Sequence, residues 1–290
     1  MNRYLRRLTI TATILLTALS LTTQAAIAAP AKTTQGTTQV DGPPRAMYVW
    51  SALPAEQVVA WASGHRVGEL LVYVHPVLGP GELDRLRDLR RRADAAGIRL
   101  SALGGDPSWT FQPAAALAWQ RTVVGTCLFT RLHVDIEPYA LREWGTDRAR
   151  TGRAFLDVLA RLKAGSALPL EADVPFWYGA ITVSGKNLAT EVLRRVSAVT
   201  VMSYRDSVTG PNSVMAISAD LLARAAVAGR PVRLAVETQP LADCPHCTFA
   251  EEGPVALAGA LDLIEAAGMA QPAFAGTAVH HLDSWLALAA

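Results

Sequence analysis

AMYVWSALP (residues 46–54) is a short apolar run that ends at a tryptophan and soon reaches a proline. A run of this length and composition predicts a buried strand, and Pro54 is typical of the first turn of a helix. A doubly wound sheet that binds a nucleotide would instead carry a glycine-rich phosphate loop after its first strand. Because the sequence has no such loop after Trp50, it favours a closed barrel over the open, doubly wound sheet.

The same alternation of strand and helix continues along the chain, with a repeat of about 30 residues. Such repetition requires parallel strands joined by right-handed crossovers. Eight units within about 250 residues have the size of a (β/α)8 TIM barrel. We therefore expect an α/β protein with a single barrel domain over residues 45–290. The predicted strands are 46–50, 70–75, 98–103, 132–136, 168–174, 198–203, 232–237 and 274–280, and the predicted helices are 54–63, 81–96, 113–124, 146–164, 186–196, 214–228 and 254–267.

Residues 1–28 have the order of features that a secretory signal peptide has. Three arginines precede an uncharged run of apolar residues and threonines, and Ala26-Ile27-Ala28 offers small residues for cleavage. The alternative is an uncleaved anchor helix, for which the apolar run is short. We expect a secreted or extracytoplasmic protein without stable membrane insertion after signal cleavage. Residues 29–44, rich in Thr, Gln, Gly and Pro, predict a disordered linker.

Composition and charge narrow the possible partners. The chain is 51% hydrophobic and 18% charged, which excludes a disordered chain and a collagen. Its formal net charge is +2, and residues 1–28 contribute three arginines and no acidic residue, so the mature chain would carry −1. Binding of nucleic acid through bulk charge requires a clearly basic face. We therefore expect no nucleic-acid partner.

Polar side chains gather where the predicted strands end, and a (β/α)8 barrel places its active site at that edge. Residues 132–139 read LHVDIEPY, and the period of two puts His133, Asp135 and Glu137 on one side of the strand. Carboxylates buried close together raise the pKa of at least one of them, which suits a protonated general acid beside an ionised partner. A structural ion network with an arginine is the alternative interpretation.

Asp135 and Glu137 form a D-x-E pair that resembles the end of the D-x-x-D-x-D-x-E motif of glycoside hydrolase family 18. Met202 and Tyr204 match the Met-x-Tyr-Asp pattern that this family has at its sixth strand. The resemblance implies a (β/α)8 barrel in which Glu137 protonates the glycosidic oxygen. It also implies that Asp135 orients the substrate's own N-acetyl group, which acts as nucleophile, and that Tyr204 contacts that group.

The sequence departs from the family pattern at four places. Thr130 and His133 stand where the motif has its two earlier acids, and the loss at residue 133 matters most because that position tunes the next Asp. Arg205 displaces Asp206 by one position. His280 stands where the family usually has a tryptophan beneath the sugar.

Two other functions stay open at this point. Glu137-Pro138 also resembles the end of the Asn-Glu-Pro motif of clan A retaining glycosidases, in which Glu237 would be the nucleophile. A retaining pair requires carboxyl groups about 5–5.5 Å apart, and the clan's Asn is replaced here by Ile136. The second alternative is a barrel that binds a glycan without cleaving it, which the missing upstream acids favour.

Further strand-end residues are candidates for contact with a polysaccharide or oligosaccharide substrate. Aromatic rings stack on the apolar faces of sugars, and acids and histidines bind hydroxyl groups. Gly104 and Gly105 allow close approach of the backbone or a positive φ, and Asp106 either binds substrate or caps the next segment. The predicted substrate-binding residues are Trp50, His75, Asp106, Trp109, His133, Asp173, Trp177, Arg205, Asp206, Glu237 and His280.

We expect no metal and no cofactor. Histidines at the strand ends suggest a metal site of the amidohydrolase type, but the first strand lacks the H-x-H motif that this type carries. Cys244 and Cys247 form a C-x-x-C in a loop, which in an exported chain predicts a local disulfide rather than a thiol oxidoreductase site.

Overall fold

The structure of the chain is a computed structural model that describes residues 42–288. The predicted signal peptide (1–28) and linker residues 29–41 lie outside the described residues. None of the helices within 42–288 combines the length and the apolar character that crossing a bilayer requires.

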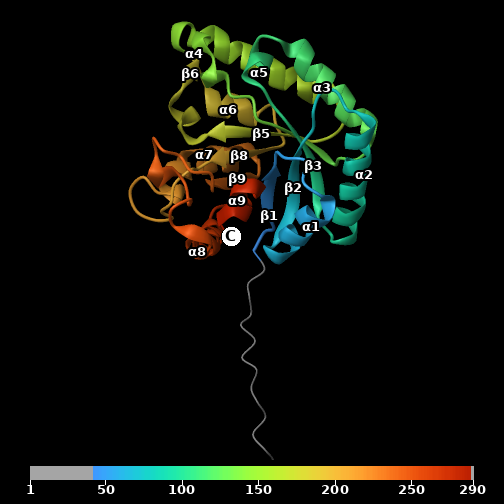
Figure 1. Cartoon of the computed structure of the whole chain (residues 1–290). Helices are drawn as coiled ribbons and strands as arrows, with labels where there is room; N and C mark the ends of the chain where they lie inside the picture. The colour runs from blue at the N-terminus through green and yellow to red at the C-terminus, as the bar shows by residue number, and fades with distance from the viewer. Residues whose placement is uncertain (1–41, 289–290) are drawn as a thin grey trace, which may run out of the picture. The chain divides into compact units, whose positions relative to one another are not determined.

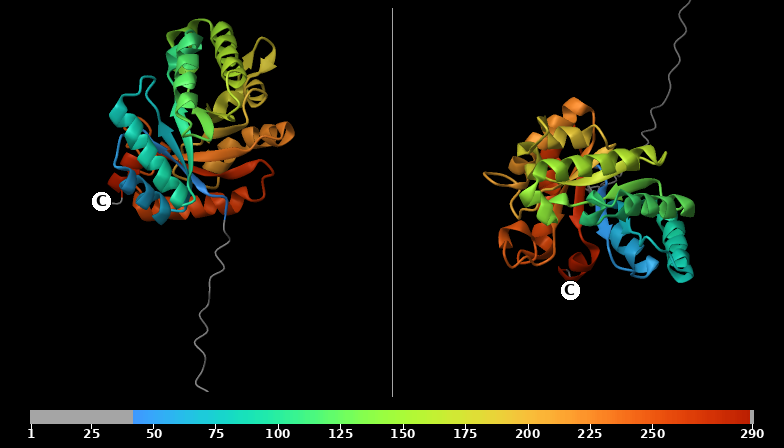
Figure 2. Two further views of the ribbon diagram at one scale, coloured as in Figure 1. Left: turned by 90° about the vertical axis from the view of Figure 1, so that its right-hand side faces the viewer. Right: turned by 90° about the horizontal axis from the view of Figure 1, so that it is seen from above.

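Eight parallel strands close into a barrel in the order β1-β10-β9-β8-β5-β4-β3-β2. The pairing of Ala46 with Ala278 joins the first strand to the last. The helices surround these strands in Figure 1 and in the two views of Figure 2. The predicted (β/α)8 barrel is therefore confirmed. Its strands are β1 (Arg45–Val49), β2 (Val67–Tyr73), β3 (Arg99–Gly104), β4 (Arg131–Val134), β5 (Leu170–Pro175), β8 (Ala198–Met202), β9 (Val232–Glu237) and β10 (Phe274–His280).

Each predicted helix has a counterpart in the structure. Asp147 caps α5 by accepting a hydrogen bond from the Arg150 backbone N–H, and Phe155 and Leu159 on this helix are buried. Gly229 ends α7 in the left-handed conformation with φ of 62°. The counterparts are α1 (Ala55–Gly64), α2 (Pro80–Ala95), α3 (Pro113–Thr126), α5 (Arg148–Ala164), α6 (Leu188–Leu193), α7 (Val214–Ala228) and α8 (Gly253–Gly268).

The sequence pattern missed several short elements. The prediction of one helix over 186–196 is wrong at its start, because residues 186–187 form β7 (Lys186–Asn187), paired with β6 (Thr182–Val183). Asn187 then caps α6 through the Thr190 backbone N–H. The other additions are α4 (Arg142–Thr146), α9 (Leu282–Leu288) and the 3-10 helices η1 (Pro107–Thr110), η2 (Pro138–Ala140), η3 (Phe176–Ala180) and η4 (Pro245–Cys247).

Two different cores lie on the two sides of the barrel wall. The large apolar core packs the strands against the helices and includes Leu70, Leu86, Trp119 and Leu159. The small apolar core consists of Ala46, Tyr48, Leu71, Leu103, Ala235 and Ala278, with Trp50 and Tyr204 packed against it. Branched aliphatic side chains fill most barrels of this kind, whereas here much of the interior is left to buried polar groups.

Candidate functional site

Charged side chains meet across the interior of the barrel. Arg233 of β9 binds Glu171 of β5 at 2.7 Å and also contacts Glu69 of β2. Since β9 is not a neighbour of β5 or β2, both contacts cross the barrel. Arg131 binds the other oxygen of Glu171 at 2.6 Å. Burial opposes ionisation of Glu171, but His133 and Arg233 hold its pKa well below the usual range.

A second group of polar side chains is formed by His133, Asp173 and Tyr48. His133 Nε2 lies 3.0 Å from Asp173 Oδ1. The Tyr48 hydroxyl donates a hydrogen bond to the same Asp173 oxygen. Burial first, and Asp173 second, raise the pKa of Tyr48 well above its usual range. His133, a predicted substrate-binding residue, has a side chain that is 0% exposed and is covered by these neighbours.

The two acids of the D-x-E pair lie at the end of β4. Asp135 continues the pairing with β3, since its backbone N–H donates to the Gly104 carbonyl at 3.0 Å. Burial, then the charges of Asp173 and Glu137, raise the pKa of Asp135 well above its usual range. Its Oδ1 is buried and has no hydrogen-bond partner among residues 42–288. A buried carboxyl oxygen without a hydrogen-bond partner is destabilising, and a donor group on a ligand would remove that cost.

Gly105 makes this arrangement possible. A Cβ atom built on Gly105 would lie 1.9 Å from the backbone oxygen of Asp135, closer than any real contact. Gly105 therefore allows close approach of two strand ends, and Gly104 allows close approach of the Trp119 ring. This is the first of the two expectations for the pair, since neither glycine has a positive φ.

Glu137 lies beside two tyrosines. The Tyr139 hydroxyl donates to Glu137 Oε1. Burial first, and then Glu137, raise the pKa of Tyr139 above its usual range. Burial and the charges of Glu137 and Asp135 raise the pKa of Tyr178 in the same direction. Both phenols thus stay protonated and neutral at physiological pH, so Tyr139 is a hydrogen-bond donor to the carboxyl group of Glu137.

Glu237 is held at the end of β9 by three donors. Its Oε1 accepts hydrogen bonds from the backbone N–H groups of Thr238 and Gln239, both at 2.8 Å. Its Oε2 lies 2.8 Å from His280 Nδ1. Trp50 donates its indole N–H to His280 Nε2 at 3.0 Å. The chain of contacts fixes the tautomer of His280, with the proton of the neutral ring on Nδ1.

Tyr204 lies between the Glu237 group and the Asp135 group. Burial, then the charges of Glu237, Asp173 and Asp135 in that order, raise the pKa of Tyr204 well above its usual range. Its ring lies 6.0 Å from the ring of His280. The structure therefore brings together Asp135, Glu137, Tyr204, Asp173, Glu237, His280 and Trp50 from the predicted set.

Three predicted residues lie elsewhere, and a fourth, Trp177, lies at the edge of the site. Trp109 is buried in the outer core, where its ring packs 5.4 Å from that of Trp119. Trp177 is half-buried and packs on Tyr139 with ring centroids 5.2 Å apart. Asp106 caps η1 through the Ser108 backbone N–H at 2.8 Å, the second of its two expected roles. His75 is exposed, with Nδ1 2.8 Å from the Val77 carbonyl oxygen.

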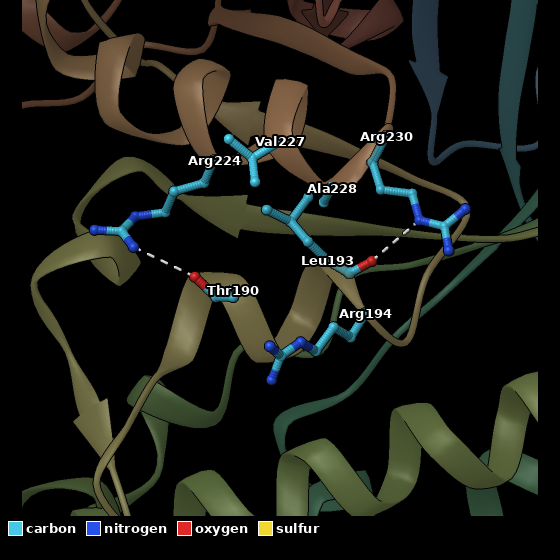
Figure 3. A pocket seen from close by; sticks show the side chains of 7 residues that line it. All are labelled: Thr190, Leu193, Arg194, Arg224, Val227, Ala228 and Arg230. Carbon is cyan, nitrogen blue, oxygen red and sulfur yellow. Dashed lines mark hydrogen bonds between the residues drawn. The ribbon is translucent and has the colours of Figure 1, made fainter.

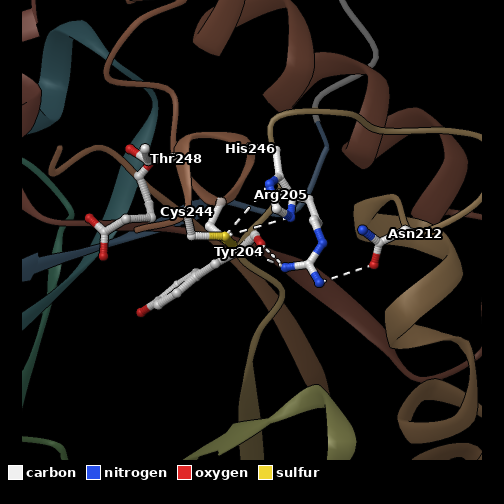
Figure 4. Close-up of a disulfide and its surroundings, with 8 residues drawn as sticks. Tyr204, Arg205, Asn212, Cys244, His246 and Thr248 are labelled. Carbon is white, nitrogen blue, oxygen red and sulfur yellow. Dashed lines mark hydrogen bonds between the residues drawn. A yellow bond between two sulfur atoms is a disulfide. The ribbon is translucent and has the colours of Figure 1, made fainter. Parts of the chain in front are cut away.

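Arg205 and Asp206 belong to a contact between two loops. Arg205 is directed away from the Tyr204 hydroxyl in Figure 4, and its guanidinium donates to Asn212 Oδ1 at 3.0 Å. The Asp206 backbone N–H donates to the His246 carbonyl at 3.1 Å. Cys244 and Cys247 form a disulfide, in agreement with the predicted local bridge. Although His246 lies beside both sulfurs, a disulfide offers no thiolate to a metal.

A separate hollow of about 480 Å³ lies between α6 and α7, on the helical layer (Figure 3). Arg194 and Arg224 beside it are paired with Glu191 and Asp220. Arg230 donates to the Leu193 carbonyl oxygen at 3.2 Å. The hollow contains none of the strand-end acids and is not part of the candidate site.

Sequence reasoning missed Tyr48 as a site residue. It lies two positions before Trp50, so the period of two along β1 directs both side chains into the barrel. The spacing of two from Trp50 could have identified Tyr48 as an inward-facing residue. Its contact with Asp173 could not be predicted in this way, because that contact depends on closure of the barrel.

No protein-family profile and no curated protein matches the sequence. Among solved structures, a chitinase from Chromobacterium violaceum ATCC 12472 superposes with a TM-score of 0.50 and 14% identity, covering 85% of this chain and 97% of that one. The spore cortex-lytic enzyme SleL of Bacillus megaterium QM B1551 gives 0.53 and 11%, with 85% and 73% covered. A mutant of the Thermobaculum terrenum O-GlcNAc hydrolase gives 0.51 and 10%, with 83% and 55% covered. At such identities the likeness establishes a shared barrel fold.

Proposed function

We propose that this protein is an exported glycoside hydrolase that cleaves a glycan containing an N-acetyl sugar. Glu137 is the general acid and base, Asp135 assists, and Tyr204 contacts the reacting group. The observation that carries the proposal is the grouping of these three side chains at the strand ends of the barrel. The fold shared with a chitinase and an O-GlcNAc hydrolase supports the same substrate class.

The chemistry follows from the types of residue present. Glu137, which accepts a hydrogen bond from Tyr139, donates its proton to the glycosidic oxygen as the bond to the anomeric carbon breaks. The carbonyl oxygen of the substrate's N-acetyl group attacks that carbon, and Asp135 binds the amide N–H. Glu137 then removes a proton from the water that opens the cyclic intermediate. The unpartnered Oδ1 of Asp135 supports a role in which its partner is supplied by substrate.

The state of Glu237 favours this mechanism over a retaining pair with Glu237 as nucleophile. A nucleophilic carboxylate needs an oxygen free to approach the anomeric carbon. Both oxygens of Glu237 are occupied by donors, and the residue is 4% exposed. Glu237 instead fixes His280, and His280 in turn fixes Trp50, whose half-buried ring is suited to stack on a sugar.

The proposal is tested by the Glu137→Gln variant. The wild type, produced from Ala29 onward, is incubated with chitin oligomers, peptidoglycan, and matched glycans with and without N-acetyl groups, and new reducing ends are measured. We expect cleavage of N-acetylated substrates, a loss of about 100-fold to 10,000-fold in kcat for Glu137→Gln, and an unchanged circular dichroism spectrum.

Glu143→Gln is the matched control, because Glu143 is exposed on α4, six residues away. Cleavage of substrates without N-acetyl groups would contradict the substrate-assisted mechanism. Binding of glycans by wild type and variant alike, with no cleavage by either, would show a binding module instead.

Export is proposed from the sequence of residues 1–28. The order of arginines, apolar run and small residues supports it. Expression of the full chain with mass analysis of the secreted product is the direct test. A product that starts at Ala29 is expected, and retention of the intact chain in the cell would contradict export.

A further inference from the structure

His133 occupies the position beneath the catalytic acids where the family that this chain resembles carries an acid. In the barrel it is paired with Leu103 of β3 and Glu171 of β5 by register. Its side chain is 0% exposed. A buried imidazole is either a neutral ring that packs against its neighbours or a cation held by carboxylates. The surroundings of the ring decide between these two states.

Carboxylates face both nitrogens of the ring. Nε2 lies 3.0 Å from Asp173 Oδ1 and Nδ1 lies 3.6 Å from Glu171 Oε2. These distances allow strong charge attraction, although neither contact is aligned as a hydrogen bond. Carboxylate oxygens opposite both nitrogens favour the protonated imidazolium, which carries an N–H on each nitrogen and a positive charge.

The charges around Asp173 point the same way. Glu171 has two arginine partners, Arg131 and Arg233. Asp173 is 5% exposed, and within residues 42–288 its one cationic partner is His133. If His133 were neutral, Asp173 would be a buried carboxylate without a counter-ion, which is strongly destabilising.

Arg233 of β9 donates to the same Glu171 Oε2 that faces Nδ1, at 2.7 Å, so the guanidinium and the imidazole share that carboxylate and the pairing with Asp173 is the one specific to His133. Tyr48 of β1 presents its ring edge-on at 5.7 Å between centroids, and its hydroxyl donates to Asp173. Burial and the neighbouring acids Asp173 and Glu137 raise the pKa of Asp135, which follows the end of β4, and the charge of His133 opposes that rise. Burial alone lowers the pKa of His133, but Asp173 and Glu171 together raise it to about 10.

We infer that His133 is a positioning residue that is protonated at neutral pH, pairs with Asp173 and cannot accept a proton from Asp135. An imidazolium has two N–H donors and no acceptor. Asp135 therefore cannot pass its proton to His133, which acts on Asp135 through its charge and its pairing with Asp173. The functional part of this inference rests on the proposed glycosidase activity, whereas the charge state does not.

The charge state is tested by nitrogen-15 NMR of the wild-type protein labelled in histidine. The His133 ring is assigned through its contacts with Tyr48, so no variant is needed. We expect both ring nitrogens to remain protonated from pH 6 to pH 9. Loss of the proton from either nitrogen below pH 8 would overturn the inference. In Asp173→Asn, the same ring should lose a proton at a pH at least one unit lower than in the wild type.

The positioning role is tested by kinetics. His133→Asn removes the positive charge opposite Asp173 and should lower kcat by about 100-fold with an altered pH profile of kcat. His65→Asn, a change at the end of α1 outside the barrel, is the control and should leave the profile unchanged. If His133→Asn lowers only the melting temperature and keeps the wild-type pH profile, the role is purely structural and the inference fails.

The two proposals fail separately. Imidazolium resonances in a protein that cleaves no glycan would refute the proposed function and leave the charge assignment standing. Cleavage that depends on Glu137 in a protein with a neutral His133 would do the reverse.

Discussion

Gly105 is the position next to Asp135 at which the barrel has no room for a side chain. The backbone oxygen of Asp135 occupies the volume of the missing Cβ, at 1.9 Å. Strand geometry fixes both partners, so neither can move without disturbing the pairing that ends in the bond between Asp135 and Gly104. A side chain here displaces Asp135 itself.

Gly105→Ala is therefore expected to lower the free energy of unfolding by about 1–3 kcal/mol or more and to reduce activity beyond what the lost stability explains. The measurements are urea denaturation and kcat at a temperature where the variant is folded. Gly125→Ala is the control, since that exposed site at the end of α3 has no atom within 4 Å of the new Cβ. The control should be neutral or about 0.5–1 kcal/mol more stable. Equal behaviour of the two variants would contradict the argument.

The inward direction of Asp135 and Glu137 could be predicted from the sequence, because alternation along a strand depends only on local geometry. The partners of His133 could not. Asp173 was predicted to share a face with Glu171, but the contact of Tyr48 with Asp173 spans 125 residues and exists only once the barrel closes. Local spacing carries no information about such a distance.

At the scale of elements, the loop after β9 is tied to the loop after β8. The Asp206 backbone N–H binds the His246 carbonyl, and Arg205 lies 3.4 Å from Cys247 Sγ. Beyond the disulfide, near the end of the loop after β9, the Phe249 backbone N–H binds the Glu237 carbonyl at 2.9 Å. The disulfide therefore lies in a loop that contacts both Arg205, which follows Tyr204, and the backbone of Glu237.

Cys244→Ser/Cys247→Ser is expected to lower the free energy of unfolding by about 2 kcal/mol, from the chain entropy of so short a loop. It should also raise KM, because the loop no longer fixes Tyr204. Calorimetry of the wild type with and without dithiothreitol should reproduce the change in stability. Cys127→Ser, at an exposed free cysteine, serves as the control. Identical melting temperatures for reduced and oxidised wild type would argue against a stabilising bridge.

The periodicity of apolar residues predicted the repeating strands and helices, but it did not predict the short elements between them. The β6–β7 hairpin has two residues in each strand, too few for alternation to be recognised. The short helix α9 follows almost directly after β10, and its seven residues are too few for a helical period to be recognised. Elements of this size are specified by caps and contacts rather than by a repeating pattern.

At the scale of the whole molecule, the polar interior makes stability depend on pH in the alkaline range. The pKa of His133 is raised to about 10 in the folded protein, against about 6.5 in an unfolded chain. Its contribution is complete below pH 6.5 and is lost as the pH rises toward 10, because over that range the folded state holds a proton that the unfolded state has released.

The free energy of unfolding of the wild type should therefore fall between pH 6.5 and pH 10, by up to about 1.4 kcal/mol per pH unit. The reference is His133→Asn/Asp173→Asn, in which neither partner titrates. The difference between the two proteins, measured by urea denaturation at several pH values, removes the contribution of all other groups. A difference that does not change with pH would show that the imidazole is neutral when folded.

The pairing of Ala46 with Ala278 also governs the order of events during synthesis. One edge of β1 stays unpaired until the last strand has left the ribosome, because its partner lies more than two hundred residues downstream. Closure of so large a loop is slow. The closed barrel therefore cannot form before the end of the chain has been synthesised, and until then the free edge of β1 is open to pairing with other strands.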